Sequence, residues 1–196
     1  MKQFYGSQKL TEKQHSKSPF RVLKVAARFR HVEKFYLPCY FDSRLRLYYT
    51  VDTVTPNGAD YQKALLSFAD GVEVTDENRE AVKRDLYITL ANTWAKKENG
   101  IKTDKLSYEG RIKFAEDFIR ELRVVADDPL STAARSIWTA ASEPFQFLAC
   151  VREIFEVLIW KTKSHTNLPN GRDASNSGMQ ILGAISQDER ACMFTC

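Results

Sequence analysis

The sequence predicts a helix-rich α+β fold with a small antiparallel sheet. Apolar residues recur at helical spacing over most of the chain, whereas residues 44–51 alternate between apolar and polar residues as a half-buried strand does. The chain has 196 residues, 43% hydrophobic and 28% charged, which is the composition of one globular domain with its own core. We expect residues 1–17, rich in Lys, Gln and Ser, to be a flexible lead-in to a domain of residues 18–196.

The first helix is expected to begin at Ser18-Pro19, because serine is a good capping residue and proline suits the first helical position. Its apolar face carries four residues at helical spacing: Val22, Val25, Phe29 and Val32. Its other face is basic and carries Arg21, Lys24, Arg28 and Arg30. A basic face is usually solvated, and contact with nucleic acid is the alternative.

A strand with one cationic face is expected next. The alternation places Arg44, Arg46 and Tyr48 on a common face. Guanidinium groups suit phosphate oxygens, and a tyrosine can stack or hydrogen-bond beside them. The other interpretation is a solvated edge strand whose charges discourage aggregation. A Pro-Asn-Gly turn at residues 56–58 closes this region.

Further helices follow this turn, and each is expected to begin at a capping residue and to carry an apolar stripe. A polar segment, residues 161–172, interrupts them. In chain order we expect a short helix from Asp60 to Phe68, one from Thr75 to Gly100, one from Ser107 to Asp128, one from Ser142 to Ile159, and a short amphipathic one around Met179, Leu182 and Ile185.

Composition and motifs exclude several classes of protein. The net charge of +4 permits contact with phosphate without proving it. The chain has no GxxxxGK[ST] loop, GxSxG elbow or HExxH pair, no apolar run near the roughly 20 residues of a membrane span, and no secretory signal. The lack of a span and of a signal predicts an intracellular protein. No CxxC pair is present, so we expect no zinc site and four free thiols, Cys39, Cys150, Cys192 and Cys196.

A second polar site lies near the end of the chain. Asp173 follows a Pro-Asn-Gly turn at residues 169–171, and small polar residues then lead toward a helix. Taken alone, this aspartate could be a helix cap.

Several short segments match one family when they are read in order. Residues 41–48 (FDSRLRLY) correspond to a D-x-R-G-R-x-Y element, and residues 56–66 to a proline, glycine-aspartate and K-x-L-L segment. Residues 143–149 (EPFQFLA) correspond to an E-P-W-Q-x-L-A helix, and residues 173–180 (DASNSGMQ) to motif A, D-G-[ST]-x-[SN]-G-[LI]-Q. In this order and spacing the chain resembles the single-subunit RNA polymerases of bacteriophages and mitochondria.

The chain departs from that pattern at three positions. Leu45 stands where the family has a glycine between the two arginines, Ala174 where a glycine follows the catalytic aspartate, and Ile181 where a histidine follows the glutamine. Ala174 is compatible with the family's chemistry because a backbone carbonyl is used there. If the family's glycine allows close approach of the backbone to nucleic acid, Leu45 would alter how the hybrid sits there.

The resemblance implies that residues 18–196 form part of a polymerase palm, ending just past motif A. It implies two-metal nucleotidyl transfer with Mg²⁺, with Asp173 as first catalytic carboxylate and metal ligand and the Ala174 carbonyl as a further ligand. The rest of motif A would support them through Ser175, Ser177, Gly178 and Gln180. Contacts to the template or the hybrid would come from Arg44, Arg46, Tyr48 and Lys63.

The implied partners are a DNA template, an RNA transcript and NTPs. The fingers helix and the second catalytic aspartate would come from a second polypeptide or a missing C-terminal part, so we expect this chain alone not to polymerise RNA. Because no transit peptide is evident, we expect a phage protein in the host cytoplasm rather than a mitochondrial one. The alternatives are a catalytically inactive nucleic-acid-binding module and a helical interaction module.

Overall fold

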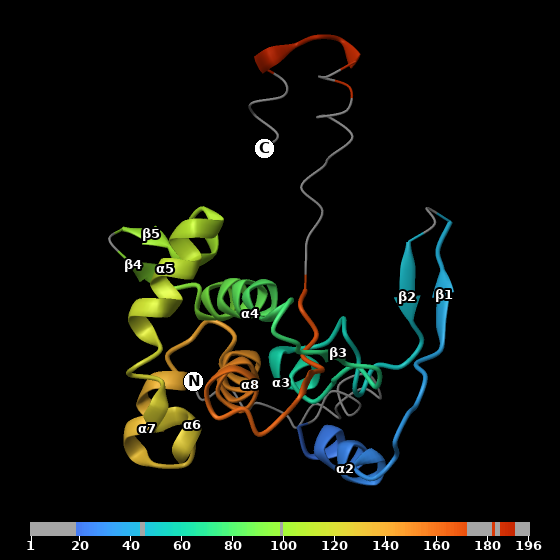
Figure 1. Cartoon of the computed structure of the whole chain (residues 1–196). Helices are drawn as coiled ribbons and strands as arrows, with labels where there is room; N and C mark the ends of the chain where they lie inside the picture. Colours follow the sequence, from blue (N-terminus) through green and yellow to red (C-terminus); the bar gives the residue numbers. More distant parts are fainter. Residues whose placement is uncertain (1–18, 44–45, 99, 172–181, 183–184, 191–196) are drawn as a thin grey trace, which may run out of the picture.

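The computed structural model describes residues 19–43, 46–98, 100–171, 182 and 185–190. Over these residues the α+β class is confirmed, because helices dominate and the strands form short antiparallel pairs (Figure 1). The lead-in of residues 1–17 and most of the helix expected around Met179 lie outside the described residues. No described helix combines the length and apolar character needed to cross a membrane.

Helices α4 (Arg79–Trp94), α5 (Tyr108–Phe118) and α8 (Pro144–Ile154) form the centre of the molecule. Their side chains meet in an aromatic cluster, in which the ring of Trp94 lies 4.9 Å from Phe118 and 5.2 Å from Phe147. Leu90 and Phe147 are fully buried. The apolar stripes expected for these three helices therefore face one shared core.

The helix expected from Ser107 to Asp128 is two helices. Ser107 is the cap of α5, as expected, and its hydroxyl accepts a hydrogen bond from Gly110 N at 3.1 Å. The chain then turns after Phe118, and α6 (Arg123–Asp127) follows. Leu122 and Val125 are fully buried in the same core. An apolar stripe reports which side of the chain is buried, so it did not reveal this bend.

The bounds of α4 also differ from the expectation. It begins at Arg79 because Asn78, not Thr75, is the cap. The Asn78 side chain accepts from Thr75 N at 2.9 Å and donates to Glu73 O at 2.8 Å, which holds the preceding turn outside the helix. The helix ends at Trp94 rather than at Gly100, with Ala95 in the left-handed region at a φ of 44°.

Several short elements complete the helical body. Gly100, at a φ of 87°, forms the turn of the hairpin β4–β5, which needs a residue without a side-chain clash at positive φ. Helix α7 was not expected; its cap is Ser131, whose hydroxyl accepts from Ala134 N at 3.3 Å. The elements are β4 (Lys97–Glu98), β5 (Ile101–Lys102), the 3₁₀-helix η1 (Thr103–Lys105), α7 (Thr132–Trp138) and, directly after α8, the π-helical turn η2 (Phe155–Ile159).

The N-terminal part lies beside this body. Helix α2 (Pro19–Phe29) confirms the first expected helix, and Val22 is its buried residue. The hairpin of β1 (Cys39–Phe41) and β2 (Leu47–Tyr49) extends away from the helices (Figure 1). The short helix expected from Asp60 to Phe68 is α3, which ends at Lys63. Beyond it, β3 (Val72–Glu73) pairs antiparallel with β6 (His165–Thr166).

Candidate nucleic-acid interface

The hairpin β1–β2 contains the described part of the predicted cationic strand. Asp42 and Arg46 are hydrogen-bonded across the loop between β1 and β2. The Asp42 carboxylate accepts from Arg46 N at 2.9 Å, and Asp42 N–H donates to Arg46 O at 3.0 Å. Asp42 therefore holds the end of the hairpin in place. Arg44 and Leu45 lie outside the described residues, so the common face of Arg44 and Arg46 stays a prediction.

A pair of tyrosines forms one face of this hairpin. Tyr40 and Tyr48 are direct cross-strand partners, and their rings stack with centroids 5.8 Å apart at 26°. Tyr40 is 52% exposed, and the Arg46 side chain is exposed with no carboxylate partner in the described part of the chain. A ring pair with one exposed and one half-buried tyrosine, beside an exposed guanidinium, suits nucleotide bases and phosphates. Reading the sequence missed Tyr40, because its pairing with Tyr48 depends on the register of the hairpin.

Lys63 is the last residue of α3, and the start of this helix is firmly held. Asp60 was expected to cap α3, but it caps α8 instead. Its carboxylate accepts from Phe145 N at 2.7 Å and from Gln146 N at 3.0 Å. Ala59 is the actual cap of α3, and its N–H donates to the buried Gln62 side chain at 2.7 Å. The bonds of Asp60 hold α3 against α8, and the bond of Ala59 holds the first turn of α3. The position of the Lys63 backbone is therefore well defined.

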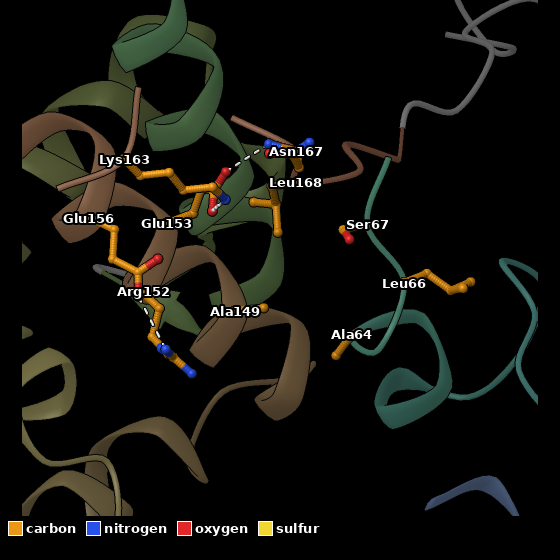
Figure 2. A pocket seen from close by; sticks show the side chains of 10 residues that line it. All are labelled: Ala64, Leu66, Ser67, Ala149, Arg152, Glu153, Glu156, Lys163, Asn167 and Leu168. Carbon is orange, nitrogen blue, oxygen red and sulfur yellow. Dashed lines mark hydrogen bonds and ion pairs between the residues drawn. The ribbon is translucent and has the colours of Figure 1, made fainter. Parts of the chain in front are cut away.

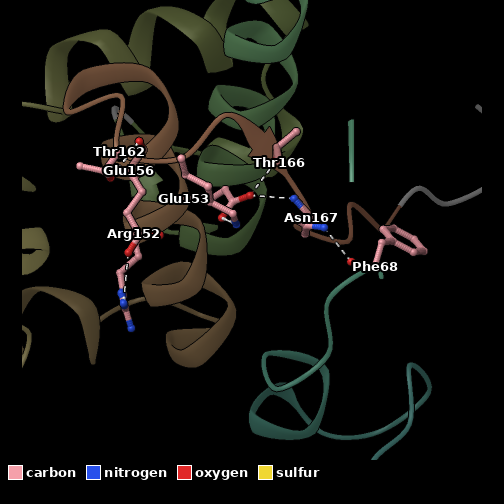
Figure 3. Close-up of polar contacts among 8 residues, drawn as sticks. Phe68, Arg152, Glu153, Glu156, Thr162, Thr166 and Asn167 are labelled. Carbon is pink, nitrogen blue, oxygen red and sulfur yellow. Dashed lines mark hydrogen bonds and ion pairs between the residues drawn. The ribbon is translucent and has the colours of Figure 1, made fainter. Parts of the chain in front are cut away.

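Glu153 on α8 accepts hydrogen bonds from the segment that precedes Asp173 in the chain (Figure 3). One carboxylate oxygen accepts from the Thr166 hydroxyl and from Asn167 N, both at 2.8 Å. The other oxygen accepts from the Lys163 ammonium at 2.8 Å. The reading of the sequence did not single out Glu153, because its partners are known only once β6 is placed.

An open groove of about 270 Å³ lies between α8 and the chain after α3 (Figure 2). Its two cationic side chains already have partners. Arg152 donates to Glu156 at 3.1 Å, and Lys163 donates to Glu153. Among the described residues that line the groove, two cations thus face two carboxylates, and neither cation is free to attract a phosphate. The hairpin is the better candidate surface for nucleic acid.

The predicted metal site cannot be placed within this geometry. Asp173 and Ala174 lie outside the described residues, as do Ser175, Ser177, Gly178 and Gln180. Among the described residues, no group of three or more His, Cys, Asp or Glu side chains is arranged to hold a metal ion. The metal-binding role expected for Asp173 therefore stays a prediction.

The family model described as DNA-dependent RNA polymerase matches residues 79–193. The chain belongs to this polymerase family. The match begins with α4 and runs through residues 173–180, the segment that resembles motif A. The resemblance to single-subunit RNA polymerases is confirmed.

Polymerases of plant organelles are similar to this family member over most of its length. "DNA-directed RNA polymerase 1B, mitochondrial" of Nicotiana tabacum is 31% identical over 169 residues, which is 85% of this chain and 16% of the relative. "DNA-directed RNA polymerase 2, chloroplastic/mitochondrial" of Arabidopsis thaliana is 30% identical over 187 residues, which is 93% of this chain and 17% of the relative. The chain thus spans less than a fifth of the length of these polymerases.

The expected phage origin and host-cytoplasm location are wrong. The relatives are plant polymerases named as mitochondrial or chloroplastic. That expectation rested on the lack of a transit peptide, a compositional signal that carries no information about which polymerases are related to the chain.

Proposed function

We propose that the chain forms part of the palm of a DNA-directed RNA polymerase and carries its first catalytic carboxylate, Asp173. The observation that carries the proposal is the family match, which runs through residues 173–180. Template, transcript and NTPs are then its partners, and the remaining polymerase parts come from elsewhere in the same polypeptide or from a second one. The relatives' names favour a mitochondrion or a chloroplast as the place of action.

The proposed metal site has the donor atoms that Mg²⁺ requires. The Asp173 carboxylate and the Ala174 carbonyl are both oxygen ligands, which Mg²⁺ prefers over nitrogen and sulfur. Bound Mg²⁺ would supply the charge that stabilises the leaving pyrophosphate. The contribution of Asp173 is to hold that charge at one fixed point beside the triphosphate.

The hairpin would position nucleic acid beside this site. Tyr40 and Tyr48 offer a stacked ring pair whose Tyr40 ring is exposed, and Arg46 offers an exposed guanidinium with no carboxylate partner among the described residues. Lys63, on the firmly held α3, would add a second phosphate contact. Such contacts orient the template or hybrid without reading its sequence.

The test is a substitution at the proposed carboxylate in the assembled polymerase. Asp173→Ala should abolish RNA synthesis from NTPs on a DNA template while binding of the template persists, because one metal ligand is lost and the hairpin is intact. The matched control is Asp76→Ala, an exposed aspartate whose salt bridge with Arg79 measures 3.3 Å, and it should synthesise RNA normally. Undiminished synthesis by Asp173→Ala would refute the proposal and leave an inactive nucleic-acid-binding module.

A further inference from the structure

Glu153 is the buried charged side chain of this fold. Among the described residues it is the only charged one in the buried set, with 7% of its surface exposed. A carboxylate is costly to bury unless its oxygens are bonded or paired. The contacts of Glu153 should therefore show what the fold gains from placing it there.

All three donors to Glu153 come from one short stretch, residues 163–167. Thr166 and Asn167 donate to one oxygen (Figure 3), and Lys163 donates to the other (Figure 2). The carboxylate therefore binds β6 and the residues on either side of it at three points. The backbone pairing of this strand is short, with two residue pairs between β3 and β6. A ladder of that length is weak on its own, so the three bonds of the carboxylate add to an attachment that is otherwise made by a few backbone bonds, such as Val74 N to Ser164 O at 2.8 Å.

The stretch is also attached on its far side. Asn167 O accepts from Phe68 N at 2.9 Å, and the Asn167 amide donates to Phe68 O at 2.8 Å. Leu168 then packs against the hydrophobic core. The chain is thus held at residues 166–168 between α8 and the segment after α3.

Asp173 follows this attachment directly in the chain. It lies six residues after Asn167, so its Cα can be at most about 22 Å from the Cα of Asn167. Movement of residues 166–168 would be passed on to Asp173 through a short linker. The attachment therefore limits where the proposed metal ligand can go.

We infer that Glu153 is a positioning residue for the polymerase: by bonding Lys163, Thr166 and Asn167, it fixes the strand from which the Asp173 segment starts. This rests on the proposed function, because it assigns Glu153 a role in presenting the carboxylate proposed to bind metal. In this role Glu153 would not itself contact substrate or metal. Its effect on catalysis passes through the strand.

Two substitutions of Glu153 distinguish the contributions of its two carboxylate oxygens. Glu153→Ala removes all three bonds. Glu153→Gln keeps an oxygen for Thr166 and Asn167 but turns an amide toward the Lys163 ammonium, so it should keep most of the attachment. Cys150→Ala is the matched control, since Cys150 is buried one turn earlier on α8 and bonds Leu86 instead.

The experiment measures two properties of each variant in the assembled polymerase. Hydrogen–deuterium exchange reports how firmly residues 163–168 are held. Electron paramagnetic resonance of Mn²⁺, added alone in place of Mg²⁺, gives the dissociation constant of the metal. Partners bonded directly to a metal ligand typically change metal affinity by about 10–100-fold when lost. Glu153 acts through the strand and a short linker, so we expect Glu153→Ala to weaken Mn²⁺ binding by less, about three- to tenfold.

The expected pattern is specific to Glu153. Glu153→Ala should speed exchange at residues 163–168 and weaken Mn²⁺ binding, Glu153→Gln should restore both nearly to normal, and Cys150→Ala should lower thermal stability without changing either. An Mn²⁺ affinity within twofold of the unmodified enzyme in Glu153→Ala would overturn the inference. If Asp173→Ala removes Mn²⁺ binding while Glu153→Ala does not, only the positioning role fails; if Asp173→Ala leaves binding and synthesis intact, the proposed function itself fails.

Discussion

Cys150 shows at the scale of a single residue how burial controls chemistry. It is fully buried, its thiol donates to Leu86 O at 3.4 Å, and burial raises the pKa of the thiol far above its ordinary value, with the nearby Glu153 adding to the rise. Only the thiolate is a good nucleophile. Cys150 is therefore a structural side chain, although its residue type is one that can be reactive.

We expect Cys150 to resist alkylation in the folded protein. With iodoacetamide at pH 8.5, Cys39, which is exposed, should be labelled while Cys150 stays unmodified, because its thiol is neutral and inaccessible. Mass spectrometry of peptides after labelling measures both sites. Labelling in concentrated guanidinium is the control and should modify both; equal rates in the folded protein would contradict the assigned burial.

The same raised pKa has a consequence for stability at alkaline pH. An unfolded thiol loses its proton above pH ~8.5, whereas the folded one keeps it. The folded state then holds more protons, so the free energy of unfolding should fall as the pH rises above that value. Cys150→Ala removes this contribution, and its stability should depend less steeply on pH in that range.

Asp60 shows how one element fixes another. It lies on α3 but accepts two backbone hydrogen bonds from the first turn of α8, at Phe145 and Gln146. A carboxylate suits that position because it satisfies free N–H groups and the positive end of the helix dipole. The bonds join segments 85 and 86 residues apart in the chain.

Removing this cap should destabilise the fold measurably. We expect Asp60→Ala to lower the free energy of unfolding by about 1–2 kcal/mol, and Asp60→Asn to lower it less, because asparagine still offers one acceptor. Urea denaturation followed by circular dichroism gives both values. Asp127→Ala, which removes an exposed 3.5 Å ion pair with Arg123, is the comparison and should change stability by less than about 1 kcal/mol. An Asp60→Ala value no larger than this control would argue against the cap.

The hairpin β1–β2 gives a second prediction at the scale of an element. Arg46→Ala should weaken binding of single-stranded DNA or an RNA–DNA hybrid and reduce the slope of log affinity against log salt by about 1, because one phosphate contact is lost. Tyr48→Ala should weaken binding with little change in that slope, because stacking is not ionic. Fluorescence anisotropy at several salt concentrations measures both.

The control for the hairpin is Lys97→Ala, an exposed lysine on β4, far from β1–β2 across the helical body (Figure 1). It should leave affinity and slope nearly unchanged. If all three variants lose affinity alike, binding depends on overall positive charge and the hairpin has no special role.

Elements could be predicted from the sequence where their signals are local. Ser107 caps α5 as predicted, and Pro19 begins α2 as predicted, because a cap and its helix lie within one turn of each other. Asp60 was assigned to the wrong helix because its true partners are distant in the chain. Glu153 and Tyr40 were missed for the same reason. Their contacts depend on where β6 and β1 lie in the folded chain, which local sequence signals do not report.

For the whole molecule, the family resemblance required a different kind of evidence. Each short segment was weak alone, and the colinear order carried the assignment to a polymerase that the family match confirms. The location could not be obtained this way, because composition near the start of a chain does not say which organelle or virus uses it. The metal site stays a prediction, since Asp173 is outside the described residues.

The aromatic centre of the core sets the stability of the molecule as a whole. Phe147 is fully buried and contacts the rings of Trp94 and Phe118, so α4, α5 and α8 all depend on it. We expect Phe147→Ala to lower the free energy of unfolding by about 3–5 kcal/mol, because it removes a large buried side chain and leaves a cavity. Phe147→Leu should recover much of this loss, since leucine refills most of the volume.

Urea denaturation monitored through tryptophan fluorescence measures that loss, since Trp94 reports the same cluster. The destabilisation should affect α4, α5 and α8 together, because these three helices share one core. Hydrogen exchange distinguishes this from the effect of Glu153: Phe147→Ala should speed exchange throughout α4, α5 and α8, whereas Glu153→Ala should act mainly on residues 163–168. If Phe147→Ala loosened only α8, the three helices would not form one cooperative unit, and the strand that Glu153 holds would rest on α8 alone.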